Sequence, residues 1–307
     1  MDFLTEKEII DRINYLRKQK NAIIITHNYQ LGEVQDIADF TGDSLELSIK
    51  AAETAADVIV FCGVKFMAET AAILSPEKTV LLPVMESGCP MADMADAADL
   101  VKMKNEHPDA LVVTYVNSSA EVKAQTDVCV TSANALKIVS SLPANREIIF
   151  VPDKNLGAYI QMKTGRKMIL WPGFCPTHMR ITPQSIIQKK KEYPDAKVII
   201  HPEARLDVIA LADEVLSTGG MCRFAKQTDA KKIIVATEIG LIYRLKRENP
   251  DKMFIPVTEQ AVCPNMKLIR IDNVLDSLEK IKFKITVSEK VREPAEKAIR
   301  KMLEMSK

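Results

Sequence analysis

The chain has 307 residues, of which 47% are hydrophobic and 27% charged, enough for one large core or several small ones. A net charge of +1 and an aromatic content of only 5% exclude a basic, base-stacking surface, so we expect no nucleic-acid partner. The first residues are charged and form no apolar signal core, and the apolar runs are only strand-length. These features predict a cytoplasmic protein with no membrane partner.

The first predicted element is a helix over residues 5–20, because Thr5-Glu6-Lys7-Glu8 forms a capping-box sequence. Similar helices are expected at about 93–106 and 183–193, and one or two amphipathic helices close the chain, the last from Pro294 to Met305. The β-rich runs fall at about 22–26, 57–62, 79–84, 110–116, 147–151, 197–201, 232–236 and 253–257. Helical patterns separate most of these runs, so the sequence predicts an α/β fold with parallel sheets.

Three Cys-Pro dipeptides indicate that the whole pattern is repeated. They begin at Cys89, Cys175 and Cys263, which are 86 and then 88 residues apart. Each cysteine follows the last residue of the early strand in its third of the chain by 60 to 62 residues. These strand-end residues are His27, Tyr115 and His201.

The repeat predicts three homologous small α/β domains, each a parallel sheet in three layers, around a pseudo-threefold axis with a central cleft. We expect them at residues 1–105, 106–190 and 191–307, the last range including the C-terminal helices. The breaks fall in polar, proline-bearing segments at 105–108 and 191–194. Ligands of open α/β sheets bind beyond the carboxyl ends of the strands, so three such edges should share one cleft.

The six cysteines divide into two groups. Cys62, Cys129 and Cys222 lie at unequal distances from the strand-end residues of their repeats, which is typical of buried packing residues. The three Cys-Pro cysteines do lie at nearly equal distances from these strand ends, so we expect their thiolates to converge on a metal. Zinc would need a fourth protein ligand, which His178 could supply, whereas an iron–sulfur cluster suits three distant thiolates and leaves one iron open.

Polar residues recur on the same strand ends. The equivalent pairs are His27 and Tyr29, Tyr115 and Asn117, and His201 and Glu203, with His178 near Cys175 as a further candidate. Their number favours acid–base chemistry in one cleft. A hydroxyl also recurs 17 positions after each strand end, at Ser44, Ser132 and Thr218. These hydroxyls are either helix N-caps or anchors for an anionic substrate at helix N-termini.

Several segments together resemble the quinolinate synthase family over nearly the whole chain. They are His27-Asn-Tyr-Gln30, Gly42-Asp-Ser-Leu45, Phe66-Met-Ala-Glu-Thr70, Gly88-Cys-Pro-Met-Ala92, Tyr115-Val-Asn-Ser118, Pro152-Asp-Lys-Asn-Leu-Gly157, Gly173-Phe-Cys-Pro-Thr-His178, His201-Pro-Glu203 and Cys263-Pro-Asn-Met266. The resemblance implies condensation of iminoaspartate with dihydroxyacetone phosphate to quinolinate, with loss of phosphate and water, in NAD biosynthesis. It also implies a functional link to an enzyme that produces iminoaspartate.

The resemblance further implies roles for individual residues. Cys89, Cys175 and Cys263 would hold a 4Fe-4S cluster whose open iron assists dehydration. Tyr29 and Glu203 would be the acid–base residues, helped by His27, Tyr115, Asn117, His178 and His201. Ser44, Ser132 and Thr218 would anchor carboxylates or phosphate, and Phe66 and Met67 would border the cleft. Cys263 stands alone, so no dithiol switch is expected there.

Two alternatives remain from the sequence. One is another threefold iron–sulfur enzyme, either the diphthamide-forming type that cleaves S-adenosylmethionine or the reductase that makes isoprenoid precursors. The other is a non-catalytic, zinc-stabilised anion-binding protein.

Overall fold

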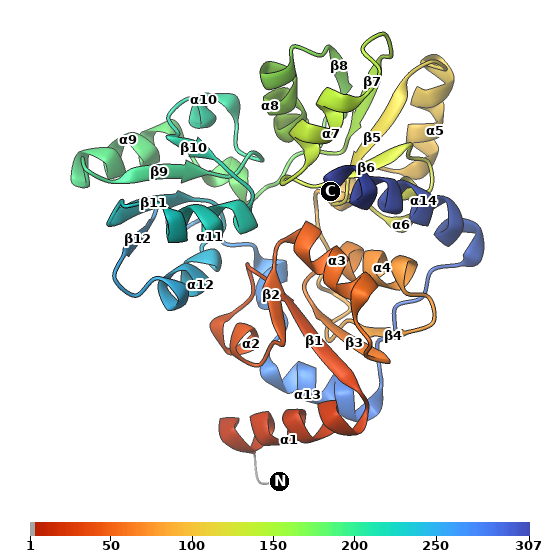
Figure 1. Ribbon diagram of the computed structural model, residues 1–307, viewed down its shortest axis with the longest axis vertical. Coiled ribbons are helices and arrows are strands. Elements are labelled where there is room, and N and C mark those ends of the chain that lie inside the picture. Colours follow the sequence, from red (N-terminus) through yellow and green to blue (C-terminus); the bar gives the residue numbers. More distant parts are fainter. Residues whose placement is uncertain (1–3) are drawn as a thin grey trace.

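A computed structural model describes residues 4–307 and confirms the predicted α/β fold. Within that range the strands form three parallel four-stranded sheets, which lie in three lobes around a common centre (Figure 1). The strand orders are β2-β1-β3-β4, β6-β5-β7-β8 and β10-β9-β11-β12. The same order recurs three times, as expected for three repeated units.

The first unit begins with the predicted capping box, because the Thr5 side chain accepts from Glu8 N and the Glu8 carboxylate accepts from Thr5 N. Its elements are α1 (Glu6–Gln19), β1 (Ala22–His27), α2 (Gly32–Asp36), β2 (Phe40–Gly42), α3 (Ser44–Glu53), β3 (Val58–Cys62), α4 (Lys65–Leu74) and β4 (Thr79–Leu81).

The second unit contains α5 (Ala97–Glu106), β5 (Leu111–Tyr115), α6 (Ala120–Lys123), β6 (Val128–Val130), α7 (Ala135–Ser141), β7 (Ile148–Val151), α8 (Lys154–Thr164) and β8 (Met168–Leu170). The third contains α9 (Pro183–Glu192), β9 (Lys197–Ile200), α10 (Leu206–Ile209), β10 (Glu214–Val215), α11 (Thr218–Gln227), β11 (Lys232–Ala236), α12 (Leu241–Glu248) and β12 (Met253–Pro256). All eight predicted strands are therefore confirmed. The sequence missed the short strands β2, β6, β8 and β10.

An aspartate ties the first two strands of every unit together. Asp39, Asp127 and Asp213 each accept a hydrogen bond from the backbone N–H 15 positions earlier, at Ile24, Val112 and Val198, over 2.7 to 2.8 Å. The backbone N–H of each aspartate returns to the carbonyl of the same partner. The carboxylate thus fixes the chain where it turns back into the edge strand, and it does so in the same way in all three units.

The last two helices do not pack on the third sheet. Helix α13 (Ile271–Lys280) packs against α1 and β3, and α14 (Glu289–Ser306) packs against β6, α6 and α4 (Figure 1). One hydrophobic cluster accordingly runs through the first and second units, whereas the third unit has separate clusters on the two faces of its sheet. The third unit meets the first at α2 and α12 and the second at α8 and α10.

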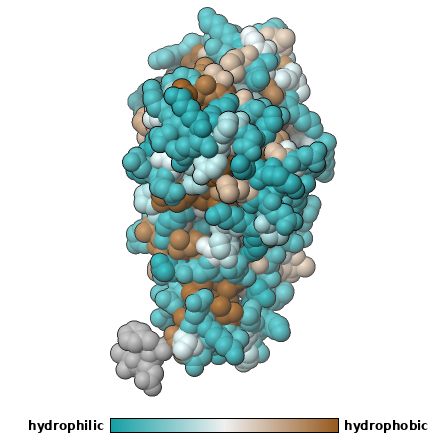
Figure 2. All heavy atoms as spheres, turned by 90° about the vertical axis from the view of Figure 1, so that its left-hand side faces the viewer, coloured by the Kyte–Doolittle hydropathy of each residue, from teal (hydrophilic) through white to brown (hydrophobic). Residues whose placement is uncertain are grey.

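The outer surface shown in Figure 2 is mostly hydrophilic, with apolar side chains in scattered groups. Among residues 4–307, every helix falls short of the length and apolar character that a membrane span requires.

Candidate active site

One cavity lies where the three units meet, beyond the carboxyl ends of their strands. The empty space in it is about 610 Å³, including the open mouth. All fifteen residues proposed from the sequence line it: His27, Tyr29, Ser44, Phe66, Met67, Cys89, Tyr115, Asn117, Ser132, Cys175, His178, His201, Glu203, Thr218 and Cys263. The lining residues that sequence reasoning missed are Asp43, Val64, Gly88, Met91, Thr177, Glu238 and Met266.

The three Cys-Pro cysteines share one local geometry. A short 3₁₀ turn follows each of them, at Ala92–Met94, His178–Arg180 and Pro264–Lys267. Backbone N–H groups of these turns donate to the sulfurs: Ala92 to Cys89, His178 to Cys175 and Met266 to Cys263. Each sulfur therefore accepts from the residue three positions on. The proline leaves no competing N–H directly after the cysteine.

The chemistry of these thiols suits a metal centre. Burial raises the pKa of Cys89 to about 12, and burial also raises the pKa of Cys175 and Cys263. Buried thiolates need a positive partner, and the turn N–H groups offer only partial charge. Three sulfurs from three units on one cavity fit a shared metal cluster better than three inert thiols. By contrast, Cys62, Cys129 and Cys222 are buried in the cores, as expected.

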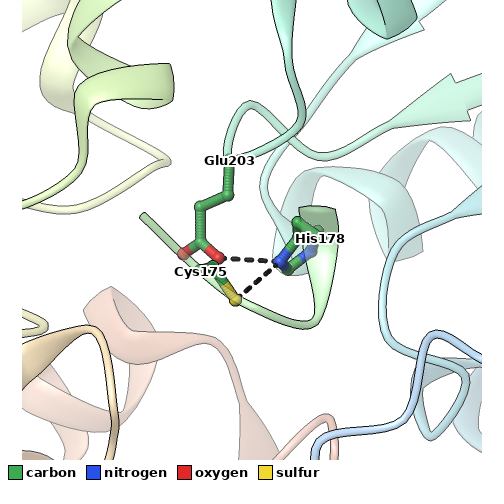
Figure 3. Close-up of side chains that lie close together, drawn as sticks. All are labelled: Cys175, His178 and Glu203. Atoms are coloured by element: carbon green, nitrogen blue, oxygen red, sulfur yellow. Dashed lines mark hydrogen bonds and ion pairs between the residues drawn. The ribbon is translucent and has the colours of Figure 1, made fainter. Parts of the chain in front are cut away.

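Cys175, His178 and Glu203 form a close group (Figure 3), in which one ligand atom from each lies within 4.8 Å of the others. His178 Nδ1 is 2.8 Å from Glu203 Oε2 and 3.1 Å from Cys175 Sγ. His178 Nε2 is 2.9 Å from the hydroxyl of Thr237. Both ring nitrogens already have partners, which disfavours His178 as the fourth ligand of a Cys3His zinc site.

A chain of hydrogen bonds joins this group to two tyrosines, one from the first unit and one from the second. The Tyr29 hydroxyl is 2.5 Å from Thr237 Oγ1, and the Tyr115 hydroxyl donates to Glu203 Oε1 over 2.6 Å. A carboxylate only accepts, so His178 carries a proton on Nδ1, and in the neutral form of the ring Nε2 accepts. Thr237 must then donate to His178 and accept from Tyr29. We call the ordered chain Tyr29, Thr237, His178 and Glu203 the relay.

The imidazoles of His27 and His201 are oriented by the backbone. His27 Nδ1 accepts from the N–H of Tyr29 over 3.2 Å, and His201 Nδ1 accepts from that of Glu203 over 3.4 Å. Since a backbone N–H can only donate, the neutral rings carry their protons on Nε2. His201 Nε2 lies 3.2 Å from the hydroxyl of Ser132, and its ring stacks on His178 with centroids 4.8 Å apart.

Burial sets the charge state of the cavity. It lowers the pKa of His27 and of His201 to about 3, so both rings are neutral at pH 7. Burial and then the nearby Glu203 raise the pKa of Tyr29 and Tyr115 well above the usual value. For Glu203, burial opposes ionisation, whereas the protonated forms of His178 and His201 and the hydrogen bonds from His178 and Tyr115 lower its pKa below the usual range. The site thus offers neutral donors around one carboxylate.

The predicted alternative that Ser44, Ser132 and Thr218 are helix N-caps is wrong. The N-cap residues are Asp43 for α3, Asn134 for α7 and Ser217 for α11. Ser44 and Thr218 are instead the first residues of their helices, and Ser132 lies in the preceding turn. The N-cap positions belong to other residues, so these three hydroxyls cap no helix, and they line the cavity.

Two further groups shape the walls. Phe66 and Met67 lie in the first turn of α4 and are 4% and 5% exposed. Asn117 Oδ1 is buried and finds no hydrogen-bond partner among the described residues, as expected for an atom that faces a ligand. The missed Glu238 accepts from Cys263 N over 3.1 Å and from Lys267 Nζ over 2.9 Å, which fixes the third Cys-Pro loop.

Fold and cavity together define an α/β enzyme of three repeated units, with one shared polar site to which every unit contributes a cysteine. The family model described as Quinolinate synthetase A protein (NadA) matches residues 11–304. The chain belongs to this family.

The curated relatives agree along the full chain. It is 58% identical to quinolinate synthase of Dehalococcoides mccartyi strain CBDB1 and 52% identical to that of Geotalea uraniireducens, each over 97% of this chain and 98% of the relative. It is 51% identical to quinolinate synthase 1 of Methanosarcina acetivorans, over 98% of both. Among solved structures, E-1-hydroxy-2-methyl-but-2-enyl-4-diphosphate reductase from Plasmodium falciparum matches with a TM-score of 0.33 and 13% identity, over 89% of this chain and 94% of that one.

Proposed function

We propose that the protein is a quinolinate synthase, which condenses iminoaspartate with dihydroxyacetone phosphate to quinolinate, with loss of phosphate and water, in NAD biosynthesis. The observation that carries this proposal is 58% identity to a curated quinolinate synthase over 97% of the chain. A cavity with neutral donors and free hydroxyls suits small substrates that bear carboxylate and phosphate groups. The two rival classes weighed from the sequence are not favoured by this match.

Cys89, Cys175 and Cys263 would hold a 4Fe-4S cluster with one open iron. The N–H donors to all three sulfurs support this assignment, since such donors stabilise thiolate ligands. When bound, the cluster supplies a Lewis acid that helps a hydroxyl group to leave.

The relay supports acid–base work by Tyr29. The hydroxyl proton of Tyr29 is directed to Thr237, so the remaining lone pair of its oxygen is free to take a proton from a substrate group in the cavity. Each residue of the relay can pass its own proton to the next, and the last proton transfer is to the Glu203 carboxylate. In the reverse direction the same chain returns a proton to a leaving group. Tyr115 holds Glu203 in place from the second unit.

The remaining predicted residues would bind and enclose the substrates. His27 Nε2 and His201 Nε2 offer N–H donors, and Ser44, Asn117, Ser132 and Thr218 offer side-chain hydrogen bonds. Phe66 and Met67 would exclude water from the reacting groups. We further propose residues 1–105, 106–190 and 191–307 as the three domains; α5 and α9 lie at the ends of the first two ranges but pack on the sheet of the following unit. We also propose a cytoplasmic location, and an iminoaspartate-producing enzyme as the supplier of one substrate.

The test is anaerobic purification followed by an assay for quinolinate from the two substrates. We expect product, together with iron and sulfide in the purified protein. An intact cluster without product would move the assignment to another threefold iron–sulfur enzyme. Zinc at full occupancy without iron would favour the anion-binding protein.

A further inference from the structure

Two residues outside the predicted site, Asn28 and Arg244, form a chain of hydrogen bonds that ends at Thr218. This chain crosses the contact between the first and third units. Asn28 follows β1 in the first unit and is fully buried. Its Nδ2 donates to Thr218 Oγ1 over 2.9 Å. Its Oδ1 accepts from a guanidinium nitrogen of Arg244, on α12 of the third unit, over 2.7 Å.

The proton positions in this chain follow from the donor inventory. A guanidinium group has no acceptor, so the atom of Asn28 beside Arg244 must be the amide oxygen. The amide nitrogen therefore faces Thr218, and the Thr218 hydroxyl must accept from it. Within residues 4–307, that hydroxyl has no acceptor for its own proton, although the residue is only 3% exposed and lines the cavity.

Arg244 is itself held firmly in place. Its Nε donates to Glu248 Oε1 over 2.6 Å, and the nitrogen that reaches Asn28 also donates to the carbonyl of Thr41, in β2, over 2.8 Å. The amide of Asn28 therefore cannot flip without losing a charge-assisted hydrogen bond. A similar arrangement exists between the second and third units, where the Nε2 proton of His201 faces the hydroxyl of Ser132 over 3.2 Å.

We propose that Asn28 and Arg244 are positioning residues that commit the Thr218 hydroxyl to donate its proton to an anionic group of the bound substrate. The inference rests on the proposed function and deepens it, because it says how one anion anchor is oriented. A hydroxyl that accepts from a fixed donor can direct its proton only into the cavity. Thr218 lies at the first position of α11, where the helix dipole favours the same anion.

The test uses one substitution to reverse the direction of the hydrogen bond between residue 28 and the Thr218 hydroxyl. In Asn28→Asp the new carboxylate pairs with Arg244, but its second oxygen can only accept, so the Thr218 hydroxyl turns its proton away from the cavity. We expect the quinolinate dissociation constant of the cluster-loaded protein to rise roughly 10-fold or more, the cost of one hydrogen bond to a charged group. The unfolding midpoint should stay at or above the parental value.

Thr218→Val separates proton direction from the added negative charge. We expect this variant to bind quinolinate as weakly as Asn28→Asp, the double variant to be no weaker than either single one, and Thr218→Ser to bind like the parent. If the losses of quinolinate affinity in the two single variants add up in the double variant, the proposal is overturned. A carboxylate that merely repels the ligand would weaken binding whether or not the Thr218 hydroxyl is present. Parental affinity in Asn28→Asp would overturn it too.

Arg244 is tested against its neighbour Arg247, which pairs with the first unit at Asp36 but does not touch Asn28. We expect Arg244→Gln to weaken quinolinate binding by roughly 5-fold and Arg247→Gln to leave it unchanged. Equal effects of the two variants would contradict the proposal, and this pair also decides the matter if Asn28→Asp does not fold. Binding is measured by titration without turnover. A parent that binds quinolinate but does not make it therefore refutes the proposed function alone.

Discussion

Thr237 joins residues that lie far apart in the sequence, because its hydroxyl is the link between Tyr29 and His178. We predict that Thr237→Val keeps the cluster but lowers kcat by roughly 100-fold, since proton transfer by a positioned group contributes at least that much. Thr237→Ser should restore most of the rate. The measurement is steady-state turnover alongside iron content. A kcat of the valine variant equal to that of the parent would show that the relay does not carry the proton.

His27 makes stability depend on pH in a defined direction. Burial lowers its folded pKa from the ordinary 6.5 to about 3, so its contribution to stability is complete above pH 6.5, declines as the pH falls and is gone below about 3. His27→Asn keeps an acceptor for the Tyr29 N–H but removes the titration. Between pH 6.5 and 5.5 we predict that the variant loses about 1 kcal/mol less unfolding free energy than the parent. Urea unfolding at both pH values tests this, and parallel losses would contradict it.

At the level of single residues, the sequence predicted which residues line the cavity more fully than it predicted the hydrogen bonds that connect them. The repeat frame selects residues that occupy equivalent positions, and these do line the cavity. Thr237 and Asn28 were missed because their function depends on a partner in another unit, which no spacing reveals. A polar residue directly after the strand run 232–236 was the available signal for Thr237. The role of Thr237 in catalysis and that of Asn28 in binding stay predictions.

The strand-joining aspartates act at the level of the secondary-structure elements. In the third unit Asp213 accepts from Val198 N, and Asp213→Ala leaves that N–H without its partner. We predict a loss of about 1 kcal/mol of unfolding free energy, a modest value because the carboxylate is partly exposed. Asp195→Ala is the control, since Asp195 makes only an exposed ion pair with Lys232. If both variants unfold at the same denaturant concentration, the aspartate does not fasten the edge strand.

Element prediction failed where the local signal was weak. The strands found from the sequence have four to six residues, apart from β4 with three, whereas β2, β6, β8 and β10 have only two or three residues and each lies at a sheet edge. Alternation cannot be read from so few positions. The caps were misplaced by one residue or two because Asp43 and Ser217 are cap formers next to equally polar residues. Only the backbone shows which of two such neighbours is the cap.

At the scale of the whole molecule, Gly219 in the first turn of α11 faces the N-terminus of α3 in the first unit. A Cβ there would meet Asp43 Oδ2 at 2.6 Å and Glu46 Oε1 at 3.0 Å. Asp43 also accepts from Ser217 over 3.0 Å, so the added methyl would displace the Asp43 carboxylate from this contact between the first and third units. We predict that Gly219→Ala weakens substrate binding and lowers the unfolding midpoint. Gly220→Ala, whose Cβ has no contact closer than 3.3 Å, should do neither. Similar behaviour of the two variants would contradict this view of the contact.

The threefold arrangement could be predicted at this scale, but the packing of the C-terminal helices could not. Equal spacing of strands and cysteines indicates three like units. Amphipathic helices show only that one face is buried. They do not say against what, and α13 and α14 cross back to the first and second units. The consequence is that one hydrophobic cluster joins the first and second units, whereas the third unit keeps its own clusters.

The central claim is that one cysteine from each unit holds a single cluster in the shared cavity. The most direct measurement is the iron and acid-labile sulfide content of the anaerobically purified parent and of Cys89→Ala, Cys175→Ala and Cys263→Ala, with Cys222→Ala as the control. We predict one 4Fe-4S cluster per chain in the parent and the control, and its loss in each of the three variants, because two thiolates retain a cluster poorly. A full cluster in any of the three, or zinc in its place in the parent, would contradict the claim.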